Sequence, residues 1–162
     1  MLFRSGPRTV LERRLCDRFG VRRPFDILTH LRSGRIGELA AVDAAPVVFE
    51  AARDGDAVAR GIVDHLADEL VLLGVSAIRR LGLTRSPVEV VLIGSVWKTD
   101  DAAFHARVRD GLLTVAPGAR IERLHEPPVL GAALIGLDLL GAGEPAHALA
   151  RRTIGAATFP VA

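Results

Sequence analysis

The sequence predicts an α/β fold in which a short parallel βαβ unit is packed by several helices. Residues 1–53 show only helical patterns, residues 57–81 form one long helix with apolar stripes, and strand and helix patterns alternate over 88–140. Two strands joined by a helical crossover form a parallel, right-handed unit. With 162 residues, of which 49% are hydrophobic, the chain is long enough for one domain with a buried core.

The first third of the chain predicts three helices. The first covers 7–19 and ends at Gly20, and the second covers 24–31. The third covers 36–53, with a break near Pro46 because proline lacks a backbone donor and crowds the preceding turn.

A long helix over 57–81 is the strongest element, about 37 Å in length at 1.5 Å per residue. Asp54-Gly55-Asp56 is expected to cap its start, and Gly82 to end it in the left-handed conformation. Its apolar residues form two rows, the first being Val58, Ile62, Leu66, Leu70, Leu73, Ala77 and Leu81, the second Val63, Ala67, Val71, Gly74 and Ile78. So wide a stripe predicts burial against a sheet or several helices.

Two strands and two helices follow, at 88–93, 101–115, 119–124 and 128–140. The first strand is almost continuously apolar, which predicts cover on both of its faces. From Ala142 onward we expect a short helix and a loose tail. Two strands are too few to cover the long helix or to protect their own edges, so we expect further strands from additional chain or from another molecule.

Composition narrows the classes of function. Although the pI is near 9.4, 20 of the 21 basic residues are arginine, a bias that we attribute to GC-rich codons. The most basic stretch, 1–23, has no interleaved aromatics, so nucleic acid is not the favoured partner. A single cysteine, Cys16, excludes an internal disulfide and a cysteine-ligated metal centre. No apolar run is long enough for a membrane span and no secretory signal is visible, so we expect a cytoplasmic protein.

Two glycine turns are the candidate binding elements. Gly94-Ser95 follows the first strand, and Gly131 lies in the first turn of the helix after the second. Such turns let a ligand approach backbone amides, but each also has an ordinary reading, as a tight turn or as close helix–sheet packing. No set of residues indicates a catalytic centre or a metal site.

The neighbours of the first turn have mostly structural readings. Trp97 is expected to pack in the core. Lys98, the only lysine, is either solvated or able to meet a phosphate. Asp100 and Asp101 are expected to favour the positive end of the following helix rather than acid–base chemistry.

Three segments carry a resemblance to a known family: ARDGDAVARGIVDHLADEL at 52–70, VVLIGSVWK at 90–98 and PPVLGAALIGLDLLG at 127–141. They resemble the C-terminal part of the BadF/BadG/BcrA/BcrD ATPase family, and within it the N-acetylglucosamine kinases of the actin, sugar kinase and Hsp70 superfamily. The resemblance extends from about residue 6 to 141. It implies a partial RNase-H-like (actin-like ATPase) C-terminal lobe, with 1–53 as its helical N-terminal segment, 54–141 as the long helix plus a βαβα nucleotide-wall unit, and 142–162 as a tail.

The resemblance also implies ligands and site residues. Intact relatives use ATP with Mg²⁺ to phosphorylate an amino sugar, and this lobe would contact the adenosine side of the cleft. The positions carried over, as cofactor-binding residues, are Gly94, Ser95, Lys98, Gly131 and Ala132. The phosphate loops and catalytic Asp of the family, of the Asp-x-Gly-x-Thr and Gly-Thr-Gly types, are absent from these 162 residues. The lobe alone is therefore expected to be inactive, with weak or no ATP binding.

Two alternatives stay open at this point. The chain is either such a lobe, completed by an N-terminal half or by a second copy, or a non-catalytic interaction module or degenerate remnant that pairs with another chain. The activator ATPases of acyl-CoA dehydratases, in the same broad family, are disfavoured because they need cysteines for an iron–sulfur cluster.

Overall fold

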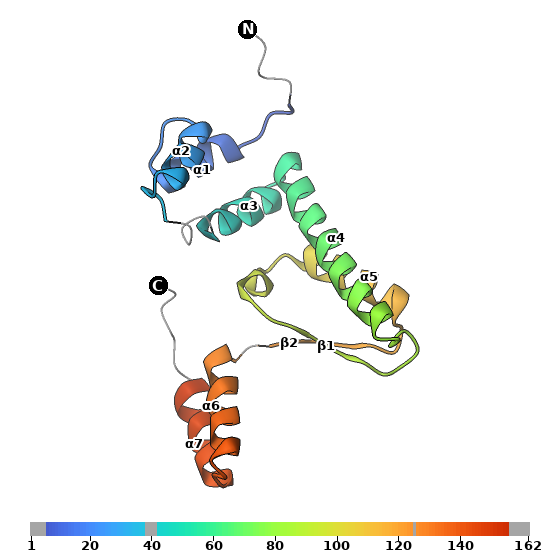
Figure 1. Ribbon diagram of the computed structural model, residues 1–162. Coiled ribbons are helices and arrows are strands. Elements are labelled where there is room, and N and C mark those ends of the chain that lie inside the picture. The colour runs from blue at the N-terminus through green and yellow to red at the C-terminus, as the bar shows by residue number, and fades with distance from the viewer. Residues whose placement is uncertain (1–5, 38–41, 125, 156–162) are drawn as a thin grey trace. The chain divides into compact units, whose positions relative to one another are not determined.

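A computed structural model describes residues 6–37, 42–124 and 126–155 (Figure 1). Within these ranges the protein is a mostly helical α/β structure with seven α-helices, the short 3-10 helix η2 and two strands. The elements, in chain order, are α1 (Leu11–Phe19), α2 (Pro24–Arg32), α3 (Ala44–Arg53), α4 (Ala57–Arg80), β1 (Glu89–Leu92), the 3-10 helix η2 (Ser95–Lys98), α5 (Ala102–Val115), β2 (Arg120–Arg123), α6 (Pro128–Leu139) and α7 (Glu144–Gly155).

The chain divides into two compact units, Met1–Glu122 and Arg123–Ala162. In the first, β1 and β2 form a two-stranded parallel sheet with α5 between them, which confirms the predicted βαβ unit. The Arg120 N–H donates to the Val88 carbonyl at 2.8 Å.

The core of the first unit lies around α4 and α5, which pack against each other, with α5 behind α4 in the view of Figure 1. Its largest fully buried side chains are Phe104, Leu112, Val63 and Val108. Two glycines let the helices approach closely, because a Cβ at Gly74 would lie 2.5 Å from Leu112 Cδ2 and one at Gly111 would lie 2.6 Å from Val71 Cγ2.

The predicted limits of α4 are confirmed to within one residue. The Asp56 carboxylate caps its start by accepting from the Ala59 N–H at 2.9 Å, and Gly82 follows its end with φ +69°. Asp56 also accepts from the Val10 N–H at 2.7 Å and from the Thr9 hydroxyl at 3.0 Å, so the start of α1 is tied to the start of α4. These hydrogen bonds, led by those from Ala59 and Val10, lower the pKa of Asp56.

The prediction that both apolar rows of α4 are buried was wrong for one of the two rows. Its second apolar row faces the core, with Val63, Ala67 and Ile78 buried. The first row is largely exposed, Ile62 at 48% and Leu73 at 67%. The physical reason is that α3 and α5 are the helices packed on α4 in this unit, and together they cover only one side of it.

Strand β1 shows the same one-sided burial, which corrects the prediction that both of its faces are covered. Val88, Val90 and Leu92 pack against the core, whereas Val91 and Ile93 are 46% and 57% exposed. Among the described residues the sheet has one packed face and one open face.

Helix α2 begins at Pro24, as predicted, whereas α1 and α3 begin later than predicted. Helix α1 starts at Leu11 rather than at residue 7, because the Thr9 hydroxyl accepts the Leu11 N–H at 3.1 Å. Helix α3 starts at Ala44 rather than at residue 36, and Pro46 lies in its first turn, where a missing N–H costs little. Residues 38–41 of the predicted helix lie outside the described residues.

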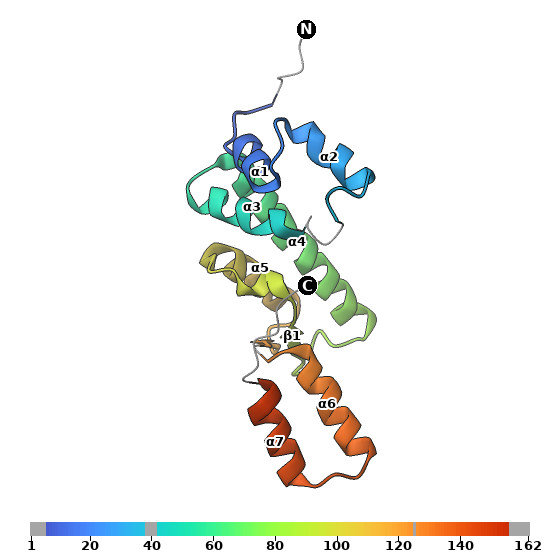
Figure 2. The same ribbon diagram turned by 90° about the vertical axis from the view of Figure 1, so that its left-hand side faces the viewer.

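The second unit is a hairpin of α6 and α7, which lie side by side (Figures 1 and 2). Leu130 and Ala150 are its buried residues in the described ranges. The short helix expected after Ala142 is α7, which has 12 residues, and the predicted loose tail falls on 156–162, outside the described residues. No helix in the described ranges has the length and apolarity needed to cross a membrane.

Candidate functional site

The connection after β1 holds three of the five candidate residues, Gly94, Ser95 and Lys98. Gly94 has φ +119° and ψ 168°, a combination that is essentially restricted to glycine. A Cβ on Gly94 would meet no described atom within 4 Å. Glycine is therefore required here by the backbone conformation and not by crowding. The space that a Cβ would occupy is open to an approaching group.

Ser95 begins η2, which has four residues. The prediction of backbone amides at a helix entry is thus corrected, because a single 3-10 turn has little of the aligned dipole of an α-helix. The amides of this turn are partly used within it, since the Trp97 N–H donates to the Gly94 carbonyl at 3.3 Å. What the connection offers is the exposed Ser95 side chain and, at the end of η2, the exposed ammonium of Lys98.

Trp97 anchors this connection to the core, as predicted. It is 8% exposed, its ring centroid lies 5.5 Å from that of Phe104, and it stacks on His105 at 6.1 Å. Phe104 in turn meets Phe49 edge to face at 5.3 Å. The aromatic cluster holds η2 in place while Ser95 and Lys98, on either side of Trp97, are exposed.

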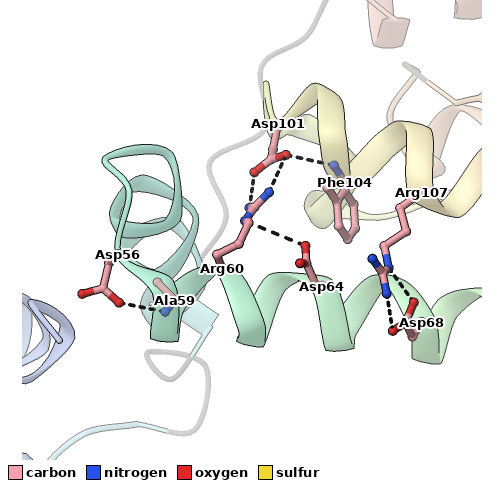
Figure 3. Close-up of polar contacts among 8 residues, drawn as sticks. All are labelled: Asp56, Ala59, Arg60, Asp64, Asp68, Asp101, Phe104 and Arg107. Atoms are coloured by element: carbon pink, nitrogen blue, oxygen red, sulfur yellow. Dashed lines mark hydrogen bonds and ion pairs between the residues drawn. The ribbon is translucent and has the colours of Figure 1, made fainter. Parts of the chain in front are cut away.

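Asp101 fixes the start of α5, and Figure 3 shows its contacts. Its carboxylate accepts from the Phe104 N–H at 2.9 Å and forms an ion pair with the Arg60 guanidinium of α4. The Arg60 bond, followed by the Phe104 backbone bond, lowers the pKa of Asp101 against the opposing effect of burial. This confirms the structural reading of Asp101.

A second ion pair joins the same two helices. The Arg107 guanidinium donates from Nε to Asp68 Oδ1 at 2.6 Å and from Nη2 to Asp68 Oδ2 at 2.8 Å (Figure 3). Asp68 is therefore a helix-pairing residue. Sequence reasoning had not singled out Arg60, because its partner lies 41 residues away and no local spacing connects them.

The other two candidate residues, Gly131 and Ala132, lie near the start of α6 and are exposed. A Cβ on Gly131 would meet nothing within 4 Å in the described part of the chain, so close packing does not explain this glycine. Gly131 and Ala132 belong to the second unit and the Gly94 connection to the first, so the structure describes two separate elements.

The residues of the Gly94 connection limit the chemistry that it could support. They could contact a ligand through a hydroxyl, a cation and an accessible backbone, but they include no general base. Within residues 6–37, 42–124 and 126–155, no group of three His, Cys, Asp or Glu side chains could hold a metal ion.

Comparisons with known proteins do not assign the chain. No protein-family model matches it, and a search of curated proteins found no match.

Proposed function

We propose that this chain is the C-terminal lobe of an ATP-dependent sugar kinase of the N-acetylglucosamine or glucosamine kinase type, in which it forms the adenosine side of the ATP cleft. The observation that supports the proposal is the Gly94 turn at the carboxyl end of β1. Ligands of open parallel sheets bind beyond the carboxyl ends of the strands. Gly94 combines that position with a glycine-specific conformation and an open side.

The three candidate residues of the Gly94 connection would then each make a different contact with the nucleotide. Gly94 lets a base or ribose approach the backbone, Ser95 provides a hydroxyl, and Lys98 provides a cation for a phosphate. ATP with Mg²⁺ supplies the transferred phosphoryl group and its charge balance. A base for the sugar hydroxyl and the phosphate loops would come from the other half of the enzyme.

Saturation-transfer NMR with millimolar ADP on the purified chain tests this proposal. Because only part of the cleft is present, we expect weak binding, seen as saturation of adenine and ribose protons. Ser95→Leu fills the space beside Gly94 and should abolish the signal. Ser76→Leu, at an exposed position on α4, is the matched control and should retain it. Equal signals in the two variants would contradict the proposal.

The same proposal predicts that the isolated chain does not phosphorylate sugar. Sugar-dependent ADP release by the purified chain, above a control without protein, would show that the missing machinery is not needed.

A second candidate function is an interaction module that pairs with another chain. It is favoured by the open face of β1, where Val91 and Ile93 are exposed, and by the exposed row of α4. In the described residues no third strand pairs with the sheet, so the edge of β1 opposite β2 has backbone groups available for a strand from a partner. Size-exclusion chromatography with light scattering separates the cases, since a stable, clean monomer counts against an obligate partner.

A further inference from the structure

The α6–α7 hairpin is closed by His147, whose two ring nitrogens both face hydrogen-bond acceptors. Nε2 lies 2.8 Å from Asp138 Oδ1 on α6, and Nδ1 lies 3.2 Å from the carbonyl oxygen of Gly143 in the connection. A carbonyl and an ionised carboxylate can only accept. Neutral imidazole has one N–H and can serve one of them, whereas imidazolium has two and can serve both.

The surroundings of His147 favour the protonated ring. Its side chain is only 13% exposed, against 71% for Asp138. The bond to the Gly143 carbonyl, the bond to Asp138 and the negative charges of Asp138 and Glu144 raise the pKa of His147 above 6.5. Asp138 is the one charged residue of α6, and on α7 the nearest cation along the chain is Arg151, one turn beyond His147 and exposed.

The polar contact matters because the apolar contact between these helices is small. Only Leu130 and Ala150 are buried in the described part of this unit, while Leu139 and Leu140 at the end of α6 are 85% and 84% exposed. With so little buried apolar surface, the His147 bonds are a large share of what holds the two helices together at this end.

We propose that His147 is a pH-sensitive clasp, which holds α7 on α6 when the ring carries both protons and loosens when one is lost. A group whose pKa is raised by folding stabilises the folded state fully below its unfolded pKa, and this contribution disappears as the pH rises through the folded pKa. The α6–α7 hairpin therefore becomes less stable from neutral to mildly alkaline pH.

Two NMR measurements on the full chain test the clasp. The first is a titration of the His147 ring between about pH 5 and about pH 9. Asp138→Asn removes the charge but keeps an oxygen acceptor, so its titration midpoint should fall below that of the wild type. Glu144→Gln is the control, because Glu144 has no bond to the ring in the described structure, and should lower the midpoint less. Equal midpoints in wild type and Asp138→Asn would overturn the proposal.

The second measurement is the protection of α7 amides against hydrogen exchange, corrected for the intrinsic pH dependence of exchange. In the wild type, protection should fall as the pH passes the His147 midpoint, and in His147→Ala it should be low at every pH. Wild-type protection that stays constant across the titration would overturn the clasp even if no variant folds.

Discussion

Gly111 of α5 lies against Val71 of α4, and its replacement by alanine gives the sharpest test of how these helices pack. A Cβ on Gly111 would lie 2.6 and 2.7 Å from the two Cγ atoms of Val71. Val71 cannot easily turn away, because a β-branched side chain in a helix has one strongly preferred rotamer. The two helices must therefore separate or accept strain.

The expected size of the effect follows from two opposing contributions. Alanine in place of a helical glycine gains about 1 kcal/mol. Overpacking of the kind expected at Val71 costs about 1–3 kcal/mol. Gly111→Ala should therefore lower the free energy of unfolding by about 0–2 kcal/mol, the difference between these two contributions.

Gly61→Ala in α4 is the matched control. A Cβ at Gly61 would meet nothing within 4 Å in the described structure. This variant should keep the propensity gain of about 1 kcal/mol without strain. The difference between the two variants isolates the overpacking, about 1–3 kcal/mol.

Urea unfolding followed by Trp97 fluorescence measures these stabilities, because Trp97 is the only tryptophan and belongs to the first unit. The double variant Gly111→Ala/Val71→Ala should recover part of the loss, with a favourable coupling of about 0.5–3 kcal/mol. Equal stability of the Gly111→Ala and Gly61→Ala variants, or zero coupling with Val71→Ala, would refute the close packing described above.

Two further predictions concern the start of α5. Because the pKa of Asp101 is lowered by folding, its contribution to stability is present above its unfolded pKa of about 3.9 and is lost as the pH falls through the folded pKa. Asp101→Asn keeps a capping acceptor, so its urea midpoint should change less with pH below about 4 than that of the wild type, and parallel losses in both proteins would contradict this role. Phe104→Ala removes the ring that contacts Phe49 and Trp97, so it should cost about 3–5 kcal/mol and shift Trp97 emission to the red. A loss below about 1 kcal/mol would show that the aromatic cluster does not hold this region together.

The parts of the fold that could be predicted are those set by local signals. The bounds of α4 follow from Asp56, which caps its first turn, and from Gly82, which takes a left-handed conformation. The order of strand, helix and strand follows from changes of hydrophobic period along the chain. These signals act within a few residues, so the sequence contains them directly.

Which of the two apolar rows of α4 faces the core could not be predicted in this way. Both of its apolar rows could face a core, and the choice between them depends on where α5 packs. The close approach at Gly74 and Gly111, and the Arg60–Asp101 ion pair between residues 41 apart, decide that choice. No local pattern in the sequence connects these residues.

For the candidate site, too, the local backbone structure could be predicted from the sequence, whereas the ligand could not. A strand that ends at Gly94 predicts a turn, and the turn has the expected glycine conformation. Whether a nucleotide binds there depends on groups outside the turn, which the local pattern of the turn does not contain.

An NMR titration of the ¹⁵N-labelled full chain with ADP most directly tests the claim that the Gly94 turn contacts a nucleotide. The chemical shift of each backbone amide reports changes in that residue's own surroundings. The account predicts that the largest shifts, growing with ADP concentration, fall on Gly94 and Ser95. Shifts confined to the arginine-rich α1 and α2, or shifts with no maximum at Gly94 and Ser95, would contradict it.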